Sequence, residues 1–147
     1  MRRVLIVTLI PILACGERAP DDRPAEEAAP AAMQPRVEIV QPAEGDTVTG
    51  SEVQVVLAAH GIRVAPAQGE RVEGEGHHHL FVDRDPTPMA DTIPKEGQGI
   101  YHLGTGAEEF TLQNVSPGEH RLIAVFAWGD HVPIPRVQAD TVRFYVR

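Results

Sequence analysis

Cysteine and serine are scarce in this 147-residue chain, and their scarcity argues against several classes of protein. Cys15 is the single cysteine, so the chain cannot form an intramolecular disulfide. The two serines, Ser51 and Ser116, lie in turn contexts, and no Gly-x-Ser-x-Gly motif marks a hydrolase nucleophile. The His-Glu-x-x-His motif of zinc peptidases is also absent. The sequence therefore assigns no catalytic residue, and we expect a binding protein rather than an enzyme.

Positive charge is scarce as well. Lysine and arginine together number 13 against 21 aspartate and glutamate residues, which gives a formal net charge of −8 at pH 7. An acidic chain is a poor partner for the phosphates of nucleic acids, so no nucleic-acid ligand is expected. The same charge is compatible with a cationic ligand, although acidity often serves solubility alone.

The chain also lacks an apolar run long enough to span a membrane, which takes about 20 residues. Residues 4–14 are mostly apolar, contain Pro11 and follow Arg2 and Arg3. A short apolar segment behind two positive charges is typical of a secretory signal, so residues 1–14 are predicted to be a cleaved signal peptide.

The residues before Cys15, Ile12-Leu13-Ala14, resemble the lipobox of bacterial lipoproteins, in which the cysteine is acylated and becomes the mature N-terminus. The resemblance implies lipidation at Cys15 and a membrane anchor in the cell envelope, facing the periplasm. Gly16, in place of an aspartate, implies the outer membrane of a Gram-negative host. An ordinary signal peptide with an incidental cysteine is the alternative.

Two regions follow the signal peptide. Residues 15–35 are rich in alanine, proline and acidic residues, which predicts a disordered tether behind the lipidated cysteine. Residues 36–147 are long enough for one domain with a single core. Polar and apolar residues alternate at 36–40, 52–57, 77–82 and 141–147, and 122–128 is a longer apolar strand. With the many glycines and prolines between them, about seven strands predict an all-β, immunoglobulin-like antiparallel β-sandwich.

The run His77-His78-His79 is the most unusual feature of this domain. In a strand, His77 and His79 share one face and lie close enough to bind one ion, whereas His78 points the other way. His102 and His131 are the candidates for further ligands. His78 and Asp83 are secondary candidates, and Asp83 could instead orient an imidazole.

Imidazole ligands suit Zn(II), Cu(II) and Ni(II), and we expect Zn or Cu. Since imidazole binds metals in its neutral form, affinity is expected to fall below about pH 6.5, the ordinary pKa of histidine. A purely structural role for these histidines is the alternative reading. His120 and His78 in particular are compatible with packing roles.

Several of these segments together resemble domain-of-unknown-function family 4399, a family of exported bacterial proteins. The matching pieces are Val64-Ala65-Pro66-Ala67, Gly76-His77-His78-His79-Leu80 with Asp83, His102 with Gly104 and Gly106, Pro117-Gly118 with His120, and Asp130-His131-Val132-Pro133. The resemblance implies an envelope location and a β-sandwich but brings no activity.

The sequence is compatible with three functions. The first is a lipid-anchored envelope protein that binds a metal, for binding or delivery. The second is a metal-free structural or adhesive module that binds an envelope protein or a glycan. The third is a hydrolase that uses a metal-bound water, which needs an open position on the metal and a nearby general base.

Overall fold

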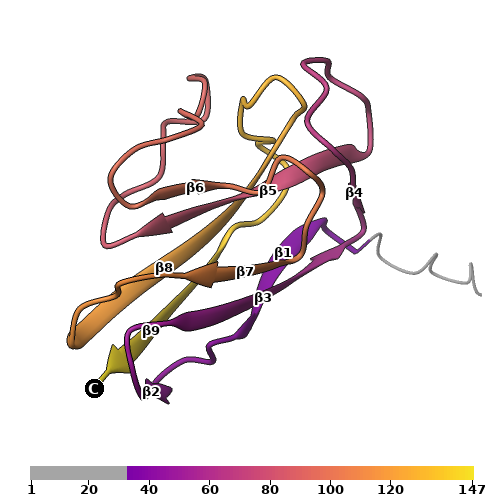
Figure 1. Ribbon diagram of the computed structural model, residues 1–147. Coiled ribbons are helices and arrows are strands. Elements are labelled where there is room, and N and C mark those ends of the chain that lie inside the picture. Colours follow the sequence, from indigo (N-terminus) through magenta and orange to yellow (C-terminus); the bar gives the residue numbers. More distant parts are fainter. Residues whose placement is uncertain (1–32) are drawn as a thin grey trace, which may run out of the picture. The chain divides into compact units, whose positions relative to one another are not determined.

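The structure of the protein, a computed structural model, describes residues 33–147 (Figure 1). The predicted signal peptide, the lipidated Cys15 and nearly all of the predicted tether lie outside the described residues. Residues 33–147 contain nine strands and no helix. No membrane-spanning helix therefore occurs in this part of the chain. The strands are β1 (Arg36–Gln41), β2 (Thr47–Val48), β3 (Val53–His60), β4 (Arg63–Val64), β5 (Glu75–Val82), β6 (Ile100–His102), β7 (Glu109–Leu112), β8 (Gly118–Ala127) and β9 (Asp140–Val146).

The strands form two sheets. The smaller sheet has the order β1-β3-β7, and the larger sheet has the order β2-β9-β8-β5-β4, with β6 also paired to β5. Strand β5 is central to the larger sheet, because it pairs with β8 along one edge and with β4 and then β6 along the other. The strand that carries three consecutive histidines is thus fixed on both sides by backbone hydrogen bonds.

The main hydrophobic core consists of alternate residues from strands of both sheets. Val53, Val55 and Leu57 face it from β3, and Val142, Phe144 and Val146 from β9. Both strands show the alternation of buried and exposed positions that the sequence predicts for a half-buried strand. Strands β5 and β8 differ, since they are buried on both faces.

The outer face of β5 and β8 is covered by loops. Phe81 from β5 and Ile123 and Val125 from β8 form a second buried cluster, together with Ile93 from the loop after β5. Figure 1 shows three long loops that rise on the side of β5 and β6, namely residues 65–74, 83–99 and 128–139. These loops surround the face on which His77 and His79 lie.

The prediction of an all-β fold is confirmed. The nine strands exceed the expected number of about seven, chiefly because β2 and β4 are two-residue strands that no sequence pattern marks. Strand β6 was also not predicted, because three residues are too few to show an alternation. The finer expectation of an immunoglobulin-like strand order stays a prediction.

Candidate metal centre

Strand β5 places two of its histidines on the outer face of the larger sheet. Successive side chains of a strand point to opposite faces, so His77 and His79 lie with Phe81, and His78 lies with Leu80 on the core side. All three imidazoles are fully buried, with an exposed fraction of 0%. The Nε2 atoms of His77 and His79 are 2.9 Å apart.

Strand β6 adds a third imidazole through its register with β5. His102 is the direct antiparallel partner of His79, and their rings stack with centroids 5.0 Å apart. Gly104 makes room for this ring: a Cβ at that position would lie 2.1 Å from Cε1 of His102. The sequence analysis assigned no steric role to Gly104. Its position two residues after His102 was the only feature of the sequence that could have indicated this role.

The fourth imidazole comes from the hairpin loop that follows β8. The backbone N–H of Trp128 donates to the carbonyl of Val132, and the backbone N–H of His131 donates to the carbonyl of Trp128. These two hydrogen bonds close a three-residue loop. His131 adopts a φ of 69°, the left-handed conformation that glycine usually occupies at the end of such a loop. A histidine held in this conformation is a costly choice for a turn and indicates a use for the side chain.

The four imidazoles form one group. One ring nitrogen from each of His77, His79, His102 and His131 lies within 4.8 Å of the other three. The Nε2 atoms of His102 and His131 are 3.1 Å apart, and the ring centroids of these two residues are 4.7 Å apart. We call these four residues the four-His group. Such a group could hold a metal ion, and the structure unites both of the candidates that the sequence offered as further ligands.

The environment keeps these imidazoles neutral. Burial, followed by repulsion from the neighbouring imidazoles, lowers the pKa of His77 to about 3 and that of His79 to about 2. Burial also lowers the pKa of His102 and that of His131, and repulsion from Lys95 adds to both shifts. Neutral imidazoles are the form that binds a metal. Protons therefore compete for the folded site at a lower pH than they do for free imidazoles, which lowers the value of about pH 6.5 expected from the sequence.

The second ring nitrogens of the two innermost histidines have no partner within the described part of the chain. Nδ1 of His77 and Nδ1 of His79 are buried and hydrogen-bond to no atom of residues 33–147. A ligating imidazole usually donates its second ring N–H to a carboxylate, a carbonyl or a water molecule, so an ion held by Nε2 would leave these two Nδ1 atoms to a buried water molecule. Four neutral nitrogen donors without a carboxylate among them form a donor set that suits Zn and Cu ions.

His78 lies outside the four-His group. Its imidazole points into the core, where it meets the ring of Phe126 edge-on at a centroid distance of 5.0 Å. Neither of its ring nitrogens has a partner among the described residues, and burial lowers its pKa to about 4. The alternation along β5 therefore separates His78 from the four-His group, and His78 is a core residue whose ring nitrogens have no hydrogen-bond partner among residues 33–147.

Asp83 also lies outside the four-His group, at the other end of β5. Its Oδ2 accepts a hydrogen bond from Nδ1 of His120 at 2.6 Å, and its Oδ1 accepts one from the backbone N–H of Arg121. Nε2 of His120 donates to the carbonyl of Ser116 at 2.8 Å. Burial lowers the pKa of His120, but these hydrogen bonds outweigh it and raise the pKa overall. His120 therefore holds a proton more tightly than a free imidazole does, and it is a clamp that joins Asp83 to Ser116 at the base of β8.

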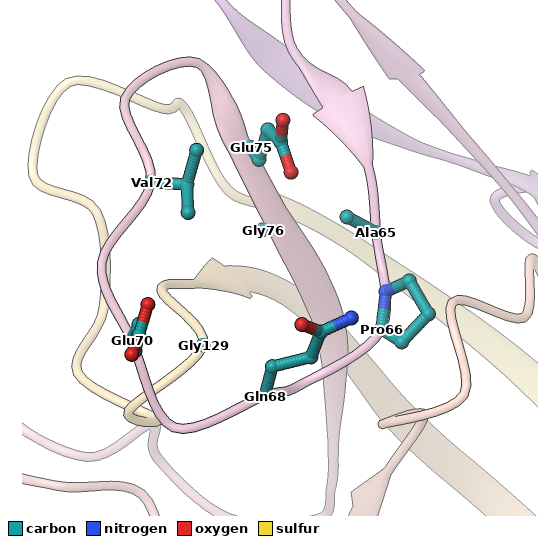
Figure 2. Close-up of a pocket in the computed structure, with 8 residues that line it drawn as sticks. All are labelled: Ala65, Pro66, Gln68, Glu70, Val72, Glu75, Gly76 and Gly129. Carbon is teal, nitrogen blue, oxygen red and sulfur yellow. The ribbon is translucent and has the colours of Figure 1, made fainter.

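Two cavities flank these features. A cavity of about 550 Å³ lies at the end of the fold with Asp83 and His120, and side-chain amides of Gln98, Gln113 and Asn114 line part of it. A smaller cavity of about 80 Å³ lies beside Gly76 and Gly129, under the loop 65–74 (Figure 2). Gly76, which lines the smaller cavity, directly precedes His77 of the four-His group.

Comparison with known proteins identifies a family but no activity. No curated protein matches the chain. One solved structure, an engineered protein from the Northeast Structural Genomics Consortium, is similar at 14% identity with a TM-score of 0.44, over 80% of this chain and 21% of that one. The chain thus spans about a fifth of that protein. Residues 55–147, which include every histidine of the four-His group, match the family described as "Domain of unknown function (DUF4399)". The resemblance seen in the sequence is therefore confirmed, and the chain belongs to the DUF4399 family.

Proposed function

We propose that this chain is a lipid-anchored protein of the cell envelope that binds one Zn(II) or Cu(II) ion through His77, His79, His102 and His131. Its role is to bind or deliver the ion rather than to catalyse a reaction. The observation that carries the proposal is the convergence of four ring nitrogens within 4.8 Å from β5, β6 and a hairpin loop. The anchor at Cys15 and an immunoglobulin-like arrangement of the strands complete the proposal.

The spacing of the donors supports binding of a single ion. Zn–N bonds of about 2.0–2.1 Å place the nitrogens of a tetrahedral site about 3.3 Å apart. The Nε2 pairs at 2.9 Å and 3.1 Å are slightly closer than this value, whereas other donor separations reach up to 4.8 Å. Small movements of the rings, which open the close pairs and draw the two pairs together, would therefore complete the site.

A titration tests the proposal. The protein, purified without a polyhistidine tag, is analysed for metal content and titrated with Zn(II) and Cu(II) against a chelator of known affinity. We expect about one ion per chain for the unmodified protein and none for a folded His77→Ala/His79→Ala variant. Absence of binding at micromolar metal would refute the proposal.

The alternative is a metal-free module that binds an envelope protein or a glycan. It is favoured by the Nε2 separations of 2.9 Å and 3.1 Å, which are also hydrogen-bond distances within two imidazole pairs. The cavity of about 550 Å³ with its amide side chains would then be the surface for a partner. In that case the His77→Ala/His79→Ala variant changes stability or partner binding, and neither protein carries metal.

A further inference from the structure

The loop 65–74, between β4 and β5, packs directly on the hairpin loop that carries His131. Gly69 donates its backbone N–H to the carbonyl of Gly129 at 3.1 Å. A Cβ on Gly129 would lie 2.3 Å from the carbonyl oxygen of Glu70, so no side chain fits between the two backbones. Figure 2 shows Glu70 and Gly129 side by side at the rim of the small cavity. A shift of one loop therefore has to move the other.

Two ion pairs with opposite polarity join the loop 65–74 to the loop 128–139, whose first residues form the hairpin loop. Nε of Arg71 contacts Oδ2 of Asp130 at 2.6 Å, and Arg136 pairs with Glu73. Each loop thus contributes one arginine and one acid. A third ion pair, between Arg63 and Glu75, joins β4 to β5 and does not involve the hairpin loop.

Asp130 links the first ion pair to the backbone at His131. Its Oδ2 accepts from Arg71, while its Oδ1 accepts from the backbone N–H of Val132 at 3.2 Å. The residue between Asp130 and Val132 is His131, whose φ of 69° is unfavourable for a side chain larger than glycine. A residue in this conformation persists only where its surroundings hold it. The Asp130 carboxylate and its arginine partner belong to those surroundings.

We propose that Arg71 is a positioning residue for the metal site: its ion pair with Asp130 holds the hairpin loop so that His131 reaches the ion. This inference rests on the proposed metal-binding function. Within residues 33–147 no hydrogen bond joins Arg71 to an imidazole, and its side chain is 55% exposed. The loop 65–74 thereby decides whether the ion has three or four imidazole ligands.

The test compares two charge reversals that change the net charge equally. Arg71→Glu places a carboxylate opposite Asp130, and Arg63→Glu does the same opposite Glu75. An exposed ion pair contributes up to about 1 kcal/mol, so we expect Arg71→Glu to weaken Zn(II) binding by up to about fivefold. Arg63→Glu, the matched control, should bind Zn(II) as the unmodified protein does. Arg71→Lys, which keeps the charge, should restore most of the affinity.

Co(II) provides a readout that a merely structural role would not change. In the unmodified protein and in Arg63→Glu, bound Co(II) should show the intense visible absorption of a four-coordinate site. In Arg71→Glu the absorption should weaken and shift as water replaces one imidazole. Arg71→Gln takes the place of Arg71→Glu if the latter does not fold. Equal affinities and equal Co(II) spectra for the Arg71 and Arg63 variants would overturn the inference. An unmodified protein that binds neither Zn(II) nor Co(II) would overturn the metal-binding function itself.

Discussion

Replacement of His78 by leucine should make the metal-free protein more resistant to acid. His78 is fully buried against Phe126, neither of its ring nitrogens has a partner in the described part of the chain, and burial lowers its pKa to about 4. In the unfolded chain the same imidazole titrates near pH 6.5. Below pH 6.5 the unfolded state therefore binds a proton that the folded state excludes, and stability falls until the pH reaches about 4.

The magnitude follows from the two pKa values. Each pH unit in this window corresponds to about 1.4 kcal/mol, so His78 lowers the free energy of unfolding by about 2 kcal/mol between pH 7.5 and pH 5. At pH 7.5 the leucine removes an unsatisfied polar group, worth about 1–3 kcal/mol. It also loses the aromatic contact with Phe126, worth about 0.5–1.5 kcal/mol. At pH 7.5 the free energies of unfolding of His78→Leu and the unmodified protein should therefore differ little. Between pH 7.5 and pH 5 this difference should change by about 2 kcal/mol in favour of His78→Leu.

Urea unfolding measures this directly, because the single tryptophan, Trp128, reports on the fold by fluorescence. Urea unfolding curves of the unmodified protein and of His78→Leu are measured at pH 7.5 and at pH 5.0, with a chelator present to keep both proteins metal-free. His78→Phe, which keeps the aromatic contact, should show the same dependence on pH even if its larger ring costs stability at both. A difference between variant and unmodified protein that stays constant from pH 7.5 to pH 5.0 would refute the reasoning.

Four further predictions concern the metal site and the clamp at the base of β8. Gly104→Ala should weaken Zn(II) binding about tenfold or more without altering a ligand, because its Cβ displaces the ring of His102; titration against a chelator measures this, and unchanged affinity would contradict it. His131→Asn should weaken Zn(II) binding to a similar extent. The metal-free variant should be no less stable in urea than the metal-free unmodified protein, because asparagine tolerates the left-handed backbone better; a clear loss of stability would count against strain at this position. Zn(II) affinity of the folded four-His group should change little between pH 7.5 and pH 6, because the pKa of each imidazole is lowered; a decline that begins at pH 6.5 would show ordinary imidazoles. His120→Gln should cost more stability at pH 5.5 than at pH 9, because the raised pKa of His120 stabilises the fold below pH 6.5 and this contribution is lost as pH rises through the raised value; equal losses at both pH values in urea unfolding would exclude a charged His120.

The alternation of side chains along a strand was enough to predict the most important feature of the site. It separated His77 and His79 from His78, and the structure has them on opposite faces of β5. The contribution of His102 depends on a three-residue strand whose register no local pattern reveals. The contribution of His131 depends on a hairpin loop with a histidine at a position where sequence rules expect glycine.

Other parts of the site needed the three-dimensional structure. Asp83 follows the histidine strand and has the chemistry of a ligand, but the strand carries it about six residues, or roughly 20 Å, away from His77. There it pairs with His120, which the sequence had placed in a packing role. The contact between Arg71 and Asp130 spans 59 positions in the sequence, so composition and spacing could not suggest it.

The burial of the four-His group has a consequence for the rate at which an ion could leave. His77 and His79 are fully enclosed and His131 is only 7% exposed, whereas His102 is partly exposed. A competing chelator would therefore approach a bound ion from the side of His102, and an ion would leave by first losing that ligand. Release past the buried ligands would instead require the hairpin loop to open, a motion that belongs to the microsecond-to-second range of local unfolding. The residence time of an ion would thus depend on how firmly β6 holds His102 against β5.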